Sequence, residues 1–192
     1  MNIISGIARG IILNVPKGLA IRPTAVKAKK SFFDSYGNWQ QKTVVDLFAG
    51  TGAIGLEAAS RGSDSIYFVE SNFKHCKIIE SNIKKVEKAG VNSEFYILCE
   101  NAVGIHKTLP LLSGKVDIIF ADPPYDIAAD IVKEMLHSKE FAEWAGHATF
   151  IFEAPSESSR KPLFNNMDLW NIKKSRKLGQ SLFYFLNVKQ SD

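Results

Sequence analysis

The chain has 192 residues, 45% of them hydrophobic, which suits one compact domain with a core of its own. No apolar run is long enough to span a membrane and the first residues do not open a signal peptide, so we expect a cytoplasmic protein without membrane contact. Net charge is only +4, but residues 1–42 carry seven basic side chains against Asp34 alone, so the remainder is slightly acidic. This asymmetry favours a polyanionic partner, with a merely solvated basic tail as the alternative.

Cysteine and histidine are sparse. Cys76 and Cys99 are too few for a disulfide framework and lack the spacing of a zinc site. The four histidines are scattered, and the adjacent His75 and Cys76 have no further ligand nearby in the sequence. We therefore predict no metal site and no disulfide framework.

The N-terminal part reads as a basic extension, residues 1–36, before a core of residues 37–192 within a single domain. Residues 3–15, rich in Ile and Gly, predict a β-hairpin with a glycine turn or bulge. Pro23 keeps the preceding residue extended, and Thr24 is placed to cap a helix to about Tyr36 whose lysines face water or ligand. The basic residues that we expect to contact phosphate are Arg9, Arg22, Lys27 and Lys29.

The next stretch has the order of a nucleotide-binding unit. Residues 44–48 read as a buried parallel strand that runs into the glycine motif Gly50-x-Gly52-x-x-Gly55. A helical pattern follows over residues 53–61, then a second strand over 65–69 that ends on an acidic residue. The glycine spacing also fits the NAD fingerprint, so the motif alone does not select the ligand.

Charge favours S-adenosylmethionine (SAM) over a dinucleotide. The Asp46 carboxylate near the loop would repel a pyrophosphate but attract the ammonium and sulfonium groups of SAM. Glu70 lies 24 positions later, near the spacing at which such folds bind ribose hydroxyls. A turn for another nucleotide, or a purely structural one, is the alternative. The residues that we predict to bind the cofactor are Asp46, Phe48, Gly50, Gly52, Glu70, Asn101 and Ala102.

Strands and helices continue to alternate in the rest of the chain, with an antiparallel pair at the end. The predicted helices are residues 72–88 (capped by Ser71), 103–112 and 127–137, and the predicted strands are 95–98, 115–121, 149–153, 169–176 and 181–188. This order predicts an α/β, Rossmann-like fold with a mostly parallel sheet and helices on both faces.

A second motif, Asp122-Pro123-Pro124-Tyr125, directly follows the strand predicted at 115–121. The prolines stiffen the turn and donate no hydrogen bonds, so the loop presents a carboxylate and backbone carbonyls beside an aromatic ring. Such acceptors suit the exocyclic amine of a flat base, on which Tyr125 can stack. A proline turn without a catalytic role is the alternative.

At these two motifs the chain resembles class I SAM-dependent methyltransferases that act on amino nitrogens. Over nearly its whole length it is similar to the bacterial small-subunit ribosomal RNA guanine-N2 methyltransferase D family. The matching segments are Ile4-Ser5-Gly6, Arg9-Gly10, Pro16-x-Gly18, Arg22-Pro23-Thr24, Phe32-Phe33, residues 46–58, Ser60-Arg61-Gly62 and Arg176-Lys177-x-Gly179. Asn101 departs from the family pattern, which has Asp there, but an amide oxygen also accepts from an adenine amine.

The resemblance implies a seven-stranded sheet whose last strand is antiparallel, SAM as methyl donor, and transfer to N2 of a guanine in 16S ribosomal RNA. It implies that Asp46, Gly50, Gly52 and Glu70 hold SAM and that residues 122–125 hold the base. The RNA would be free or part of an assembled or partly assembled small subunit. We expect a monomer, because no exposed apolar stripe demands a dimer.

Three alternatives stay open at this point. A DNA adenine-N6 or cytosine-N4 methyltransferase uses the same proline motif, but the chain has little room for a target-recognition region. A protein glutamine methyltransferase usually has Asn where Asp122 stands. A SAM-binding or RNA-binding module without catalysis would not need both intact motifs.

Overall fold

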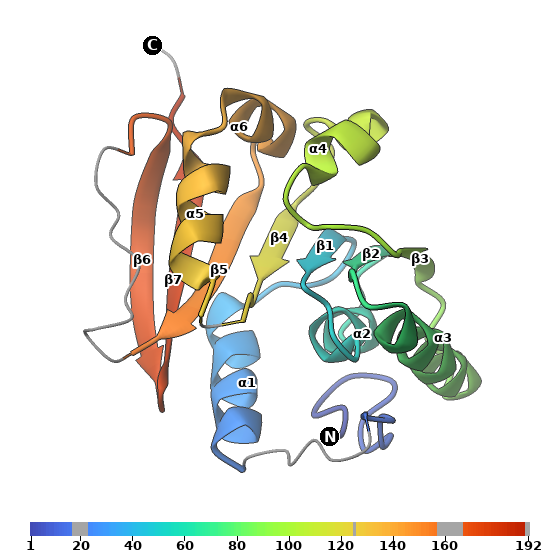
Figure 1. Ribbon diagram of the computed structural model, residues 1–192. Coiled ribbons are helices and arrows are strands. Elements are labelled where there is room, and N and C mark those ends of the chain that lie inside the picture. Colours follow the sequence, from blue (N-terminus) through green and yellow to red (C-terminus); the bar gives the residue numbers. More distant parts are fainter. Residues whose placement is uncertain (17–22, 125, 157–166, 191–192) are drawn as a thin grey trace. The chain divides into compact units, whose positions relative to one another are not determined.

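The computed structural model describes residues 1–16, 23–124, 126–156 and 167–190, with only the backbone given for residues 23–28 and Ser35. The chain forms two compact units, Met1–Ala102 and Val103–Asp192 (Figure 1). The seven strands have the order β3-β2-β1-β4-β5-β7-β6, and β7 is antiparallel to β5 and β6. The predicted α/β fold with a mostly parallel, seven-stranded sheet and an antiparallel last strand is therefore confirmed. The single-domain organisation stays a prediction.

The first unit is a three-stranded parallel sheet with helices α2 and α3 on one face (Figure 1). Its elements are α1 (Pro23–Tyr36), β1 (Thr43–Leu47), α2 (Ala53–Ser60), β2 (Ser65–Val69), α3 (Phe73–Lys88) and β3 (Glu94–Leu98). Helix α3 begins one residue later than predicted, because Asn72 rather than Ser71 is its N-cap: the Asn72 side chain accepts from the Lys74 amide at 2.9 Å.

The N-terminal segment is only partly the hairpin that we expected. Its ends meet in a single antiparallel bridge between Asn2 and Ile12, without a strand ladder. Backbone hydrogen bonds from the Ile3 amide to the Ile11 carbonyl and from the Leu13 amide to the Met1 carbonyl accompany the bridge, at 3.0 and 2.8 Å. The amides of Ile4 and Ser5 donate instead to the Glu57 carboxylate on α2, at 2.8 and 3.0 Å. The hairpin prediction is therefore confirmed for the antiparallel pairing of the two ends and wrong for the strand ladder, because α2 supplies the acceptors for Ile4 and Ser5.

Glu57 is the centre of a buried charge cluster in the first unit. Its carboxylate is fully buried and also accepts from Arg61 Nε at 2.9 Å. Lys29 Nζ lies 3.5 Å from the same carboxylate and donates to the Ala53 carbonyl at 2.6 Å. Burial lowers the pKa of Lys29 to about 8. The cluster joins α1, α2 and the N-terminal segment.

We expect Glu57→Ala to lower the free energy of unfolding by about 3–5 kcal/mol, because it leaves a buried lysine uncompensated and two backbone amides without their acceptor. Denaturant unfolding measures this change. Glu80→Ala is the matched control, since that carboxylate forms only an exposed pair with Lys77 and its loss should cost about 0–1 kcal/mol. A loss for Glu57→Ala no larger than that of the control would contradict the assigned role.

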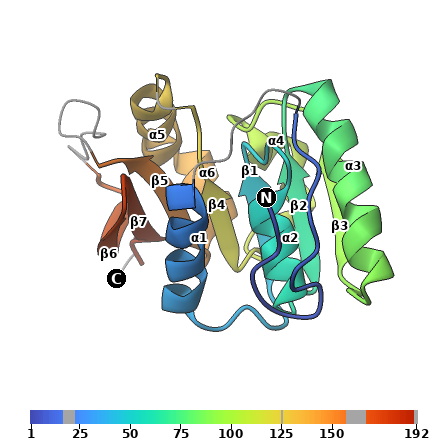
Figure 2. The same ribbon diagram turned by 90° about the horizontal axis from the view of Figure 1, so that it is seen from below.

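The second unit pairs β4 parallel to β5 and continues antiparallel through β7 to β6, with α5 over one face of β5 and β7 (Figures 1 and 2). Its elements are α4 (Ile105–Thr108), the 3₁₀ turn η1 (Pro110–Leu112), β4 (Ile118–Ala121), α5 (Ala128–His137), α6 (Lys139–Ala145), β5 (Thr149–Pro155), β6 (Trp170–Leu178) and β7 (Ser181–Val188). A cluster of Phe141, Phe150 and Trp170 anchors its core.

Helix α6 was not predicted. Its capping signal is present in the sequence, since the Ser138 hydroxyl accepts from the Phe141 amide at 3.0 Å. The helix is seven residues long, too short for a clear 3.6-residue period. Among the described residues, no helix has the length and apolar composition needed to cross a membrane.

Candidate active site

The loop after β1 has the backbone of a close-approach ligand site. Gly50 and Gly52 have φ values of 57° and 76°, and Phe48 also lies in the left-handed region at 58°. That region is strained for a residue with a Cβ atom, which explains the glycines at the two later positions. A Cβ at Gly55 would lie 2.4 Å from the Phe68 ring, so α2 packs on the sheet only because no side chain stands there.

Asp46, near the end of β1, holds this loop from beneath. Its carboxylate is 2% exposed and accepts from the Gly55 amide in the first turn of α2 at 2.9 Å. Burial raises the pKa of Asp46 to about 7, because desolvation of the carboxylate raises the pKa by more than the nearby Lys29 lowers it. A cationic ligand over the loop would favour the ionised form, so Asp46 suits SAM rather than a pyrophosphate.

The raised pKa predicts opposite effects of Asp46→Asn on stability and on binding. The folded protein binds the proton of the Asp46 carboxyl more tightly than the unfolded chain does. The contribution of Asp46 to the free energy of unfolding therefore falls as pH rises from about 4 to about 7. The isosteric amide removes the buried charge and can still accept from Gly55. We expect Asp46→Asn to be more stable than the native protein at pH 8, by about 1 kcal/mol or more.

For SAM binding, in contrast, the ionised form of Asp46 should be favourable. Native SAM affinity should increase from pH 6 to pH 8 as Asp46 ionises, and this added pH dependence should be absent from Asp46→Asn. Thermal unfolding and calorimetric titration at both pH values test the two effects, and the difference between the two proteins cancels any titration of SAM itself. A variant that is less stable at pH 8, or that binds SAM with the native pH profile, would contradict this account.

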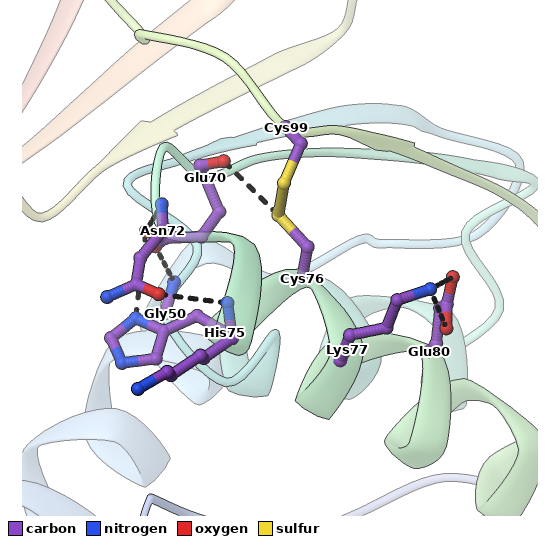
Figure 3. The surroundings of a disulfide bond; sticks show 9 residues. Gly50, Glu70, Asn72, His75, Cys76, Lys77, Glu80 and Cys99 are labelled. Carbon is purple, nitrogen blue, oxygen red and sulfur yellow. Dashed lines mark hydrogen bonds and ion pairs between the residues drawn. A yellow bond between two sulfur atoms is a disulfide. The ribbon is translucent and has the colours of Figure 1, made fainter.

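Glu70 follows β2 directly, and the structure fixes its carboxylate at the glycine loop (Figure 3). One oxygen accepts from the Gly50 amide and the other from the Asn72 amide, both at 2.8 Å. His75 Nδ1 lies 3.6 Å from the same group. A carboxylate can accept about two hydrogen bonds per oxygen, so each oxygen keeps room for a hydroxyl. The arrangement fits the vicinal hydroxyls of a ribose.

Asn101 and Ala102 complete this half of the site. They follow β3, and since β1, β2 and β3 are parallel, the glycine loop, Glu70 and these residues share one edge of the first unit's sheet. Asn101 is exposed and Ala102 is buried. The donors and acceptors of this edge fit a nucleoside with a cationic tail. Among the described residues, no three His, Cys, Asp or Glu side chains gather as a metal ion would require.

A disulfide joins Cys76 to Cys99 beside Glu70, where no disulfide framework was predicted (Figure 3). Cys76 lies in the first turn of α3 and Cys99 follows β3, so their Cα atoms are 6.3 Å apart although 23 positions separate them. Cys76 Sγ lies 3.3 Å from the Glu70 carbonyl oxygen. The bond ties the helix after Glu70 to the segment that leads to Asn101. Sequence spacing did not show that these two elements converge.

In the second unit, the proline motif follows β4 without a gap. Asp122 is exposed and Pro123 is buried, so the carboxylate is presented from a packed turn. The Pro124 carbonyl accepts from the Ile127 amide at 3.1 Å, which closes the turn before α5. Asp122 and the Pro123 carbonyl remain the acceptors that we propose for a base amine. Tyr125 lies outside the described residues.

The four predicted phosphate contacts have different outcomes. Lys29 was expected to face water or ligand and is instead buried against Glu57, because it neutralises a carboxylate that the N-terminal segment needs as an acceptor. Arg9 is exposed in a turn whose neighbour Ile7 reaches the beginnings of β2 and β3, the edge opposite the glycine loop. Arg22 lies outside the described residues, as does the side chain of Lys27.

The strand order and the loop–carboxylate geometry fit the Rossmann-like fold of class I SAM-dependent methyltransferases. A family model described as "Conserved hypothetical protein 95" matches residues 1–187 of the chain. The chain belongs to this family.

Two relatives and one solved structure are similar to the chain over much of its length. The Bacillus subtilis protein YlbH, named as an rRNA methyltransferase, is 36% identical over 126 residues, which are 65% of this chain and 67% of the relative. Ribosomal RNA small subunit methyltransferase D of Escherichia coli is 27% identical over 186 residues, 94% of this chain and 86% of the relative. The structure of the Escherichia coli methyltransferase yhhF superposes with a TM-score of 0.70 at 22% identity over 98% of each chain.

Proposed function

We propose that the protein transfers the methyl group of SAM to the exocyclic N2 of a guanine in small-subunit (16S) ribosomal RNA. The observation that carries this proposal is the pairing of two motifs in one family member: a carboxylate-anchored glycine loop after β1 and Asp122-Pro123-Pro124 directly after β4. The names of the relatives from Bacillus subtilis and Escherichia coli support ribosomal RNA as the substrate.

The protein's part in this reaction is alignment and charge stabilisation. SAM supplies an electrophilic methyl group on a sulfonium that is already a good leaving group. Glu70 holds the ribose hydroxyls, and Asp46 contributes a negative field beneath the loop. Asp122 and the Pro123 carbonyl accept from the amine, orient its lone pair and stabilise the positive charge that develops on nitrogen. Asp122 or water then takes the released proton, and Tyr125 stacks on the unpaired base.

We further propose that the enzyme acts in the cytoplasm as a monomer. Its RNA substrate is either free or part of an assembled or partly assembled small subunit. DNA adenine-N6 or cytosine-N4 methylation uses the same proline motif, but no described element outside the two units' sheets and covering helices offers a target-recognition domain.

Methyl transfer from labelled SAM tests the substrate class. The acceptors are unmodified small-subunit RNA, unmodified small ribosomal subunits and duplex DNA, each at equal nucleotide concentration. We expect label in the RNA or in the subunit and background counts in DNA. Label in DNA alone would overturn the proposal in favour of a DNA methyltransferase, and SAM binding without label in any acceptor would favour a binding module.

A further inference from the structure

Strand β6 forms an edge of the second unit's sheet and carries basic side chains on both of its faces. It is the last strand in the sheet order, and every residue from Asn171 to Lys177 is exposed. No acidic residue occurs between positions 169 and 191. The strand's cations are Lys173, Lys174, Arg176 and Lys177, and in the part of the chain that the structure describes none of them belongs to an ion pair.

The geometry of β6 spreads these charges over both faces. The bulge between Ile172 and Lys174 leaves Lys173 outside the ladder. Lys174 pairs with Phe185 and its Nζ lies 4.3 Å from the centre of that ring, so a cation–π contact holds it. Lysines and bulges also protect edge strands from aggregation. That explanation accounts for charge on the strand, but not for the hollow beside it.

The hollow lies at the beginning of β6 and has a volume of about 560 Å³. It is lined by Gly146, His147, Asn171, Lys173, Asn187, Val188, Lys189 and Gln190. Two lysines, a histidine and three amide side chains therefore face one cavity, and none of the described residues that line it carries a carboxylate. Lys189 Nζ donates to the Met167 carbonyl at 2.9 Å, a neutral acceptor that fixes the side chain without cancelling its charge. This lining suits a phosphodiester with hydrogen-bonding sugar and base groups.

The register of the second unit directs the strand toward the catalytic loop. Across β4, β5, β7 and β6, the residues Ala121, Phe152, Tyr184 and Ser175 are level with one another. Arg176 and Lys177 thus lie beyond the level of Ala121, on the edge where Asp122 follows β4. Three strand spacings of about 4.8 Å separate β6 from β4, or about 14 Å. A short extended piece of RNA covers that span.

We propose that β6 and the hollow at its beginning form a track for the ribose–phosphate backbone of the substrate RNA, which leads the target nucleotide toward Asp122. This inference rests on the proposed function, since it names how the RNA substrate is held. It also gives a role to the Arg176-Lys177 segment, which neither the glycine loop nor the proline motif explains.

The test compares two triple variants with the same change of net charge. Lys173→Gln/Arg176→Gln/Lys177→Gln removes the track and keeps Lys174 for its contact with Phe185. Lys84→Gln/Lys88→Gln/Lys133→Gln is the control, on exposed positions of α3 and α5. The affinity of each for unmodified small-subunit RNA is measured over a range of salt concentrations, with thermal unfolding and SAM titration alongside.

We expect the track variant to bind RNA about ten- to a hundredfold more weakly at 0.1 M salt, with a logarithmic salt slope smaller by about 2, since each lost contact to single-stranded RNA removes about 0.7. Its KM for RNA should increase, while kcat, SAM affinity and melting temperature stay native. The control should remain within about twofold. The single variant Lys177→Gln should lower the salt slope by about 0.7. It tests the same contact if the triple variant does not fold.

A track variant with the RNA affinity and salt slope of the control would overturn the proposal. The outcome is separable from the proposed function. If the native protein binds RNA through β6 but transfers no methyl group, the RNA track is supported and the proposed enzymatic function is contradicted. If the native protein methylates small-subunit RNA and the track variant has an unchanged KM, the proposed enzymatic function is supported and the RNA track is contradicted.

Discussion

We expect Asp122→Ala to reduce kcat for RNA methylation by about 10²–10³-fold while SAM affinity stays within about twofold of native. The carboxylate stands directly after β4, in a turn whose Pro123 is buried. In the mechanism that we propose, it stabilises charge that exists only as the nitrogen is alkylated. A preorganised acceptor of this kind typically contributes a factor of that size. Because the effect is confined to the transition state, kcat rather than binding should carry it.

Two further substitutions sharpen this result. Asp122→Asn keeps one acceptor oxygen without the charge and should be intermediate. Asp126→Ala removes an exposed carboxylate from the same loop and should leave kcat nearly native. Single-turnover kinetics with saturating SAM and RNA measure the three rates. Native turnover in Asp122→Ala, or an equal loss in Asp126→Ala, would remove Asp122 from the reaction.

The second large effect concerns Glu70→Ala, for which we expect about 10²-fold weaker SAM binding. The substitution removes the two ribose-hydroxyl contacts that we propose and also the acceptor that holds the Gly50 and Asn72 amides, both at 2.8 Å. Hydrogen bonds to a charged group contribute about 1.5–3 kcal/mol each, and one such loss corresponds to roughly a factor of ten or more in Kd. At saturating SAM, kcat should remain within a few-fold of native.

Calorimetric titration of SAM measures the Glu70 effect. Glu70→Gln retains one oxygen acceptor and should lose about tenfold, whereas Glu80→Ala, farther along α3, should bind normally. Since Glu70 also supports the loop, the melting temperature of each variant is measured first, and binding is compared below the lowest transition. Native affinity in Glu70→Ala would exclude this carboxylate from the ribose site.

Local signals in the sequence predicted most of the first unit correctly. The strand over residues 65–69 and the helix from Ala53 appear where periodicity and the glycine motif place them. Glu70 accepts from the Gly50 amide because parallel strands bring their carboxyl ends to one edge, a rule that also applies to the predicted strand order. These features depend on short stretches of chain and on a rule of sheet topology.

The errors depend on contacts distant in sequence. The sequence near Lys29 does not show that Glu57, on the next helix, needs a counter-ion. The burial of Lys29 was therefore not predicted. The same distance hid the approach of Cys76 to Cys99. The N-terminal hairpin lacks a strand ladder because Glu57, 53 positions away, supplies the acceptor for the Ile4 amide. Polar residues are read from sequence as surface groups, and only the fold reveals which ones pair in the interior.

The basic track was missed for a different reason. The alternation and aromatic content of residues 169–176 predict a strand, and the uneven distribution of charge points to residues 1–42 as the basic segment. The absence of any acid between positions 169 and 191 was a signal that could have been found. What the sequence did not contain was the hollow, which residues from before β5, from β6 and from around the end of β7 build together.

The central claim, methylation of guanine N2, is tested most directly by the identity of the product nucleoside. Unmodified small-subunit RNA or small subunits are incubated with the native protein and labelled SAM, digested to nucleosides and separated against standards. We expect label in N2-methylguanosine alone, formed about 10²–10³-fold more slowly when Asp122→Ala replaces the native protein. Label in N6-methyladenosine or in a methylated cytidine would contradict the assignment of the target atom while retaining the methyltransferase itself.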